Sequence, residues 1–104
     1  MCKLGKAWEL NREGMQACNN GEFDKAESNL KTAIQMSQCK SKKIHRATLH
    51  NNLAVVLQMS GKMEEAVQAY DLAISFLNPG HKGQAALIER IESKREQLIQ
   101  QLAA

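Results

Sequence analysis

The 104-residue chain repeats itself at an interval of 40 residues, and this repeat limits its fold more than any other feature of the sequence. Residues 21–26 and 61–66 both read Gly, polar, large apolar, acidic, charged, Ala, and residues 30–34 and 70–74 continue the match. After the Ala at 26 or 66, apolar residues follow four, seven and eight positions later, which is the spacing of one helix face. The chain therefore holds two copies of a helical unit and a C-terminal remainder.

Glycine and proline mark where these helices are expected to end. Gly21 and Gly61 each follow a helical pattern at the position of a C-terminal cap, and residues 78–80 (Asn-Pro-Gly) form the strongest break in the chain. A fifth apolar stripe follows this break among Glu, Lys, Arg and Gln residues, and consists of Ala86, Leu87, Ile91, Leu98 and Leu102. We predict an all-α chain with helices at about 4–19, 23–38, 43–60, 63–77 and 83–102.

Small residues recur where two helices of a hairpin would cross, with Gly14 or Ala54 on the first helix and Ala26 or Ala66 on the second. This pattern resembles the tetratricopeptide repeat over about residues 7–78. The residues that carry the resemblance are Gly14, Gly21, Phe23, Ala26, Leu30, Ala33, Leu53, Ala54, Gly61, Ala66, Tyr70 and Ala73. It implies a single domain, residues 1–104, with antiparallel helix-turn-helix hairpins at about 7–40 and 43–78 and a C-terminal capping helix at 83–102. Such a domain is a fragment of a right-handed α-solenoid.

Three features depart from the usual family pattern. The family repeat has about 34 residues, so a period of 40 implies about six extra residues near 39–44, as in kinesin-light-chain-like members with longer linkers. Residues 49–54 also look like the first helix of those members. Glu13 stands where the family normally has Leu, which implies less typical packing or partial exposure of the first helix. Two repeats are fewer than the usual three, so stability is expected to be modest or supplemented by self-association.

Sequence motifs for catalysis are missing from the chain. It contains no glycine-rich phosphate loop, no GxSxG elbow and no HExxH pair. Cys18 with His45 or His50 is a weak candidate for a thiol–imidazole pair, and Cys39 with the two histidines is an equally weak metal site. The histidines are five residues apart, which puts them on different faces of one helix. We expect no enzyme activity, no cofactor and no metal.

Composition indicates where the protein works. No apolar run approaches the roughly 20 residues needed to span a bilayer, and the chain does not start like a signal peptide. Its three cysteines are widely spaced, without a CxxC pair, which favours a reducing compartment, and we predict the cytoplasm. The net charge is +3 and is uneven, with nine Lys and Arg against five Asp and Glu in residues 1–52. Much of the excess lies in residues 40–46, which we interpret as a solvated linker that could also attract phosphates or an acidic partner.

The resemblance also implies a binding surface, because the first helix of each tetratricopeptide hairpin lines an inner groove that holds a peptide or short helix of a partner. Asn52 matches the groove asparagine that commonly bonds to the backbone of that peptide, and its amide can donate and accept. Only Asn52 fits the carboxylate clamp of chaperone co-factors, since Asn11 and Met15 occupy the clamp's Lys and Asn positions. A groove of amides and apolar side chains suits an amphipathic peptide better. The expected groove residues are Trp8, Asn11, Arg12, Met15, Asn19, Thr48, Asn51, Asn52, Val55 and Met59.

Alternatives remain open at this point. Trp8 could simply pack against the second helix, and Asn52 could be an ordinary exposed polar residue. The primary hypothesis is a non-enzymatic adaptor or co-chaperone that binds a protein partner. A second is a homo-oligomeric scaffold that assembles through the fifth helix or an exchanged hairpin. A third is a nucleic-acid accessory role for residues 40–46, which lack an aromatic residue for base stacking.

The fifth helix carries more apolar residues than one packing seam needs. They are Leu87, Ile88, Ile91, Leu98, Ile99 and Leu102. Its basic residues Arg90, Lys94 and Arg95 are expected to form a solvated face.

Overall fold

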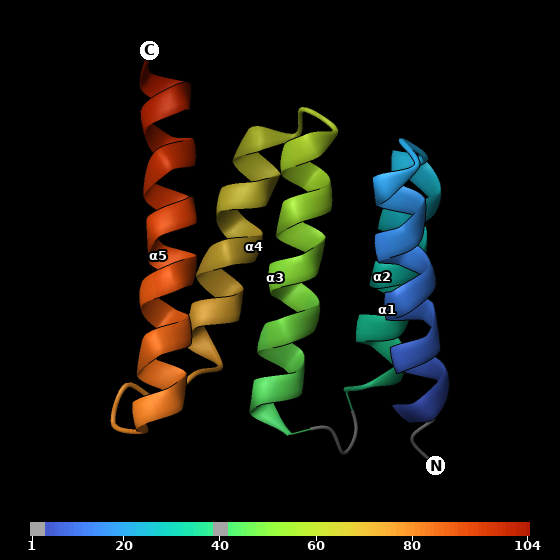
Figure 1. Cartoon of the computed structure of the whole chain (residues 1–104), viewed down its shortest axis with the longest axis horizontal. Coiled ribbons are helices and arrows are strands. Elements are labelled where there is room, and N and C mark those ends of the chain that lie inside the picture. Colours follow the sequence, from blue (N-terminus) through green and yellow to red (C-terminus); the bar gives the residue numbers. More distant parts are fainter. Residues whose placement is uncertain (1–3, 39–41) are drawn as a thin grey trace.

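A computed structural model describes residues 4–38 and 42–104 of the chain (Figure 1). In these residues the chain forms five α-helices and no strand. The helices are α1 (Leu4–Asn19), α2 (Phe23–Met36), α3 (Lys43–Met59), α4 (Met63–Ser75) and α5 (Lys82–Ala103). The all-α prediction is therefore confirmed, and each helix boundary lies within two residues of the position expected from the sequence.

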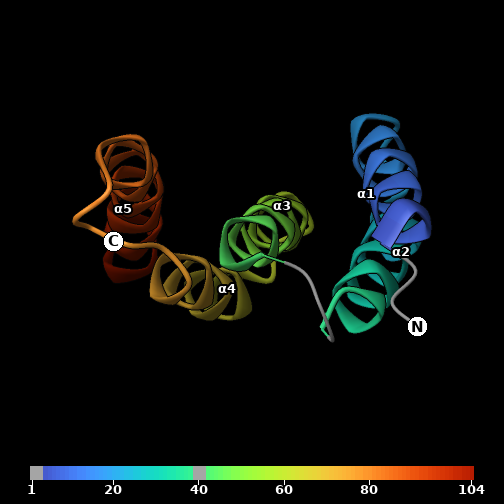
Figure 2. The same ribbon diagram turned by 90° about the horizontal axis from the view of Figure 1, so that it is seen from below.

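The helices form two hairpins and a final helix that stand side by side in a curved layer. Within the hairpins, α1 packs against α2 and α3 against α4, and α5 then packs mainly on α4. Figure 2 shows that α1, α3 and α5 lie on the inner side of the curve, whereas α2 and α4 lie on its outer side. This is the arrangement of an α-solenoid fragment, as the repeat predicted.

Two glycines allow the tight turns within the hairpins. Gly21 has φ of 79° and Gly61 has φ of 88°, a left-handed conformation that residues with a side chain rarely adopt. The next residue in each turn then donates its backbone N–H to a carbonyl five positions earlier, Glu22 to Ala17 and Lys62 to Leu57, both at 2.8 Å. These bonds satisfy carbonyl groups that the helix end would otherwise leave open. Both predicted glycine caps are confirmed.

The small residues of the repeat lie where the hairpin helices touch. Gly14 on α1 is so close to α2 that a Cβ placed there would come within 3.2 Å of the Ala26 carbonyl oxygen and of the Leu30 side chain. Leu30 is fully buried beside this crossing. In the second hairpin Tyr70 fills the corresponding space and donates its hydroxyl to Gln58 Oε1 at 2.9 Å. In both copies of the repeat, small residues therefore allow the two helices of the hairpin to cross closely, and a larger residue fills the space beside the crossing.

Two residues of the apolar stripe predicted for the fifth helix are exposed, Ala86 and Leu102. Ile91 and Leu98 are buried against the hairpins, and Leu87 and Ile88 pack at the edge of the same core. Ala86, in contrast, is exposed, so its assignment to the apolar stripe was wrong. The reason is angular, because Ala86 lies five positions before Ile91 and so points away from the face that α4 covers. Glu13, at the position where the family has Leu, is exposed as expected.

Candidate functional site

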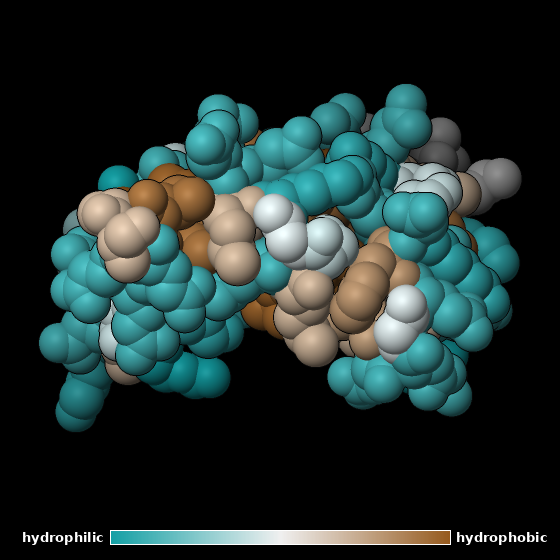
Figure 3. Space-filling model, turned by 90° about the horizontal axis from the view of Figure 1, so that it is seen from above, coloured by the Kyte–Doolittle hydropathy of each residue, from teal (hydrophilic) through white to brown (hydrophobic). Residues whose placement is uncertain are grey.

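The ten residues expected in the groove all lie on α1 or α3, the two inner helices of the hairpins. We call the surface that they form the inner face. None of the ten is fully buried, because Arg12, Asn19 and Met59 are exposed and the other seven are half-buried. Figure 3, which views the molecule from the end where the hairpin turns lie, shows apolar side chains gathered near the middle of the array and again toward α5. Because all ten residues keep exposed surface and four of them (Trp8, Met15, Val55 and Met59) are apolar, the inner face is accessible and partly apolar.

Two asparagines meet across the joint between the hairpins. Asn52 on α3 donates from Nδ2 to Asn11 Oδ1 on α1 at 2.8 Å. This bond uses neither the Asn52 carbonyl oxygen nor the Asn11 amide nitrogen, so the pair keeps one acceptor and one donor for another chain. Next to it on α3, the side-chain oxygen of Asn51 is buried and has no hydrogen-bond partner among the described residues. The inner face thus carries a fixed amide pair, and the oxygen of the neighbouring Asn51 is buried.

Two sulfur-containing side chains also join the hairpins near the end of the inner face. The thiol of Cys18 on α1 donates to the sulfur of Met59 on α3 at 3.5 Å. Met59 is 54% exposed, whereas Cys18 is almost completely buried. Burial raises the pKa of the Cys18 thiol, so the thiol stays protonated and unreactive. Cys18 is therefore a packing residue, while Met59 offers a flexible apolar contact to solvent.

Trp8 packs at the start of the inner face. Its ring meets His45 of α3 edge-on, with the ring centroids 5.3 Å apart. It also contacts a small buried cluster of Ala7, Ala33 and Leu49, so Trp8 packs within the fold and keeps only part of its surface accessible. The Thr48 hydroxyl bonds within its own helix, where it donates to the Ile44 carbonyl at 3.1 Å.

The two histidines of α3 point to different elements, as their spacing predicted. His45 meets Trp8, whereas the His50 ring stacks on Phe76 at the end of α4, with centroids 5.3 Å apart. Arg46 lies 5.9 Å over the same Phe76 ring and donates to the backbone carbonyl of Gln38. Burial, aided by the charge of Arg46, lowers the pKa of His50. This cluster around Phe76 could not be predicted from the sequence, since its members come from separate segments of the chain.

No group of three His, Cys, Asp or Glu side chains within residues 4–38 and 42–104 is arranged to hold a metal ion. Cys39, the third member of the weak metal candidate, lies outside the described residues.

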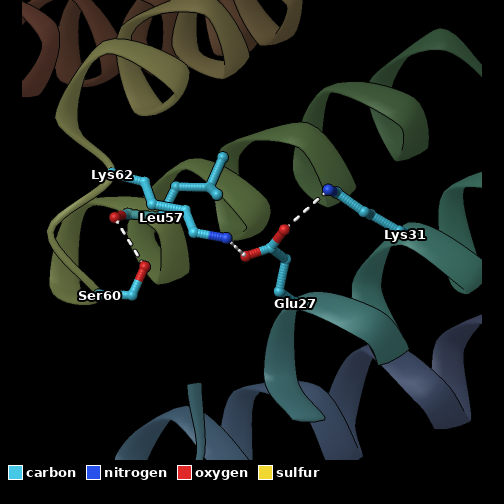
Figure 4. Close-up of polar contacts among 5 residues, drawn as sticks. All are labelled: Glu27, Lys31, Leu57, Ser60 and Lys62. Atoms are coloured by element: carbon cyan, nitrogen blue, oxygen red, sulfur yellow. Dashed lines mark hydrogen bonds and ion pairs between the residues drawn. The ribbon is translucent and has the colours of Figure 1, made fainter. Parts of the chain in front are cut away.

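An acidic residue connects the hairpins on the side opposite the inner face. Glu27 of α2 accepts hydrogen bonds from Lys31 on its own helix, at 2.7 Å, and from Lys62 in the turn between α3 and α4, at 2.9 Å (Figure 4). These two bonds lower the pKa of Glu27, whose side chain is only 14% exposed. The bond to Lys62 spans 35 positions of the sequence, so no local pattern indicates it.

The three basic residues of α5 are exposed or partly exposed, and two of them also contact the fold. Arg95 pairs with Asp71 on α4 and is only about one-third exposed. Lys94 is half-buried, and burial together with the charge of Arg90 lowers its pKa.

The fold and the inner face define a helical-repeat protein of the kind that binds other polypeptides. The sequence model of the tetratricopeptide repeat matches residues 7–78, and the chain belongs to this family. Repeats of this family are non-catalytic and mediate protein–protein interactions. The similarity to the longer repeats of kinesin light chains stays a prediction. Neither a curated protein nor a solved structure matches the chain. In the part of the chain that the structure describes, no helix has the length and apolarity to cross a membrane.

Proposed function

We propose that residues 1–104 form one interaction domain that holds a peptide or short helix of a partner protein on its inner face. In this proposal the protein is a small cytoplasmic adaptor or co-chaperone and not an enzyme. The observation that carries the proposal is the hydrogen bond between Asn52 and Asn11, which fixes two amides at the joint of the hairpins. Amides held in this way can bond to any peptide backbone, whatever its side chains.

Apolar contacts would supply most of the affinity. Met15, Val55 and Met59 lie on the same helices as the amide pair and are half-buried or exposed. Methionine adapts its shape to different partners, and a tryptophan such as Trp8 is frequently an energetic centre of an interface. A partner segment with one apolar side and an accessible backbone would satisfy both features of the inner face.

The self-assembly alternative receives less support. The exposed side of α5 carries mainly charged residues, and Leu102 is the large apolar side chain that it exposes. The charged residues concerned are Glu89, Arg90, Glu92 and Glu96. The third alternative, nucleic-acid binding by residues 40–46, has no aromatic residue in that segment to stack on bases.

Affinity capture from native lysate tests the proposal. The bait is the full chain, and the variant Asn52→Ala/Val55→Glu removes an amide and places a charge on the inner face. We expect the bait to retain a partner protein that the variant loses. The control is Thr32→Ala/Gln35→Glu, a similar change at exposed positions of α2, which should retain the partner. Identical captured proteins for both variants would show that the inner face is not the binding surface.

A further inference from the structure

One end of the molecule is basic and has no acidic side chain in its loops. The start of α3, the end of α4 and the start of α5 lie together at this end (Figure 1). Residues 37–46 and 76–88 contain no Asp or Glu. In the described part of these segments the cations are Lys42, Lys43, Arg46 and Lys82. At the other end, the hairpin turns carry Glu22, Asp24, Glu64 and Glu65, so the two ends of the molecule differ in sign.

A pocket of about 420 Å³ opens at the basic end, and we call it the end pocket. Ile44, Phe76 and Leu77 supply apolar lining, and Ile44 is 36% exposed although it is a large apolar residue. Lys42 and Lys43 also line the pocket and are exposed. Gln84 of α5 closes one side, where its side-chain oxygen accepts from the Asn78 backbone N–H at 2.8 Å. The lining of the pocket is thus mainly polar and basic, with three apolar side chains among it.

The two lysines have no carboxylate to neutralise them. Neither Lys42 nor Lys43 forms an ion pair with any residue that the structure describes. Two adjacent exposed cations without a counter-charge attract an anionic partner.

We propose that the end pocket docks an acidic peptide segment of a partner protein that carries one large apolar side chain. The apolar side chain enters over Ile44, Phe76 and Leu77, and flanking carboxylates lie against Lys42 and Lys43. This surface is separate from the inner face and does not depend on the function proposed above. Because the lysines are exposed, the interaction weakens as salt is added.

A nucleic acid fits this end less well than an acidic peptide does. Base recognition by single-strand binders uses an open aromatic ring on which bases stack. Phe76 is the aromatic residue of the end pocket, but His50 stacks on its ring and Arg46 lies over it. The ring is therefore less open to a stacked base, whereas Ile44 beside it stays exposed to an apolar side chain.

Selection from a library of short random peptides against the full chain, at low salt, tests this inference. We expect the enriched peptides to be acidic and to contain a Leu, Ile, Met or Phe. Their affinity should fall about tenfold or more with Lys42→Glu/Lys43→Glu. This variant keeps the fold, because acidic residues at a helix start stabilise the helix. Ile44→Ser should also weaken binding without any change of charge.

Matched variants separate this site from other effects. Lys6→Glu/Lys25→Glu changes the net charge equally, at exposed positions outside the end pocket, and should bind the selected peptides as the original chain does. Val55→Glu on the inner face should also leave their affinity unchanged. Peptides lost with Val55→Glu but kept by the lysine variant would overturn the end-pocket proposal and support the inner face alone.

Three other results would overturn the proposal. The first is a selection that enriches no acidic peptide. The second is an oligouridine RNA that binds through Lys42 and Lys43 while no peptide does, which would assign the basic end to nucleic acid. The third is an oligomer of the original chain that dissociates in the lysine variant, seen by sedimentation. That result would assign the pocket to the acidic end of a second copy.

Discussion

Asn52 on α3 and Asn11 on α1 share a hydrogen bond of 2.8 Å, although 41 positions separate them in the sequence. On the opposite side of the same joint, Glu27 accepts from Lys62 at 2.9 Å. The two hairpins are therefore connected by polar contacts on both sides, in addition to their apolar packing. A short repeat array has few interfaces, so contacts between neighbouring repeats weigh heavily in its stability.

The Asn52–Asn11 bond should contribute measurably but modestly to folding. We expect Asn52→Ala to lower the free energy of unfolding by about 1 kcal/mol, the usual net value of one hydrogen bond, and to leave the chain folded. Urea denaturation of Asn11→Ala, Asn52→Ala and the double variant measures the coupling directly. Purely additive effects of the two single changes would show that the bond contributes nothing.

Gly14 should not tolerate a methyl group. Its added Cβ would lie 3.2 Å from a backbone oxygen of α2, so Gly14→Ala should cost about 1–3 kcal/mol through overpacking. Gly5 is the matched control, because nothing lies within 4 Å of a Cβ there. Gly5→Ala should be neutral or stabilise α1 by up to about 1 kcal/mol, since alanine favours helix. Thermal unfolding of both variants compares them, and equal behaviour would contradict the close crossing of α1 and α2.

Glu27 should make the free energy of unfolding depend on pH in the acid range. Its bonds to Lys31 and Lys62 hold its pKa below the ordinary value of 4.5, so the unfolded chain binds the proton more readily. The stabilisation is fully present above that value and is lost as the pH falls through the lower pKa of the folded state. Urea midpoints at neutral pH and at about pH 3 should therefore differ less for Glu27→Gln than for the original chain.

The control for this change is Glu64→Gln, at an exposed position outside the bridge. Its urea midpoint should differ between neutral pH and about pH 3 as much as the midpoint of the original chain does. The bridge would be refuted if Glu27→Gln and Glu64→Gln had the same effect.

His50 should make the free energy of unfolding depend on pH in a higher pH range than Glu27 does. Burial and Arg46 lower its pKa below 6.5, so protonation favours the unfolded chain. Its contribution to stability is constant above pH 6.5 and declines as the pH falls below that value toward the pKa of the folded state. His50→Phe keeps an aromatic ring on Phe76 and removes the titration. Unfolding measured from about pH 7.5 to about pH 5 should be less pH-dependent in this variant, and an unchanged slope would argue against a buried neutral His50.

Much of the fold could be predicted because the relevant signals are local. The period of 40 residues placed both hairpins, and Gly21 and Gly61 marked their turns because a left-handed residue is needed there. Ala86 was misassigned since a single apolar residue near a helix start does not define which side a neighbour will cover. The candidate residues of the inner face were placed on the correct helices, and their role in binding stays a prediction.

The sequence by itself determined the helices, their turns and the small residues at each crossing, because these depend on spacing within one copy of the repeat. The tertiary structure decided which polar side chains meet. Asn11 with Asn52, Glu27 with Lys62, and Arg46 and His50 with Phe76 each come from different helices or turns. Their pairing depends on the angle and offset between packed helices, which no single segment encodes. The end pocket exists for the same reason, since three separate segments form it only after the layer has assembled.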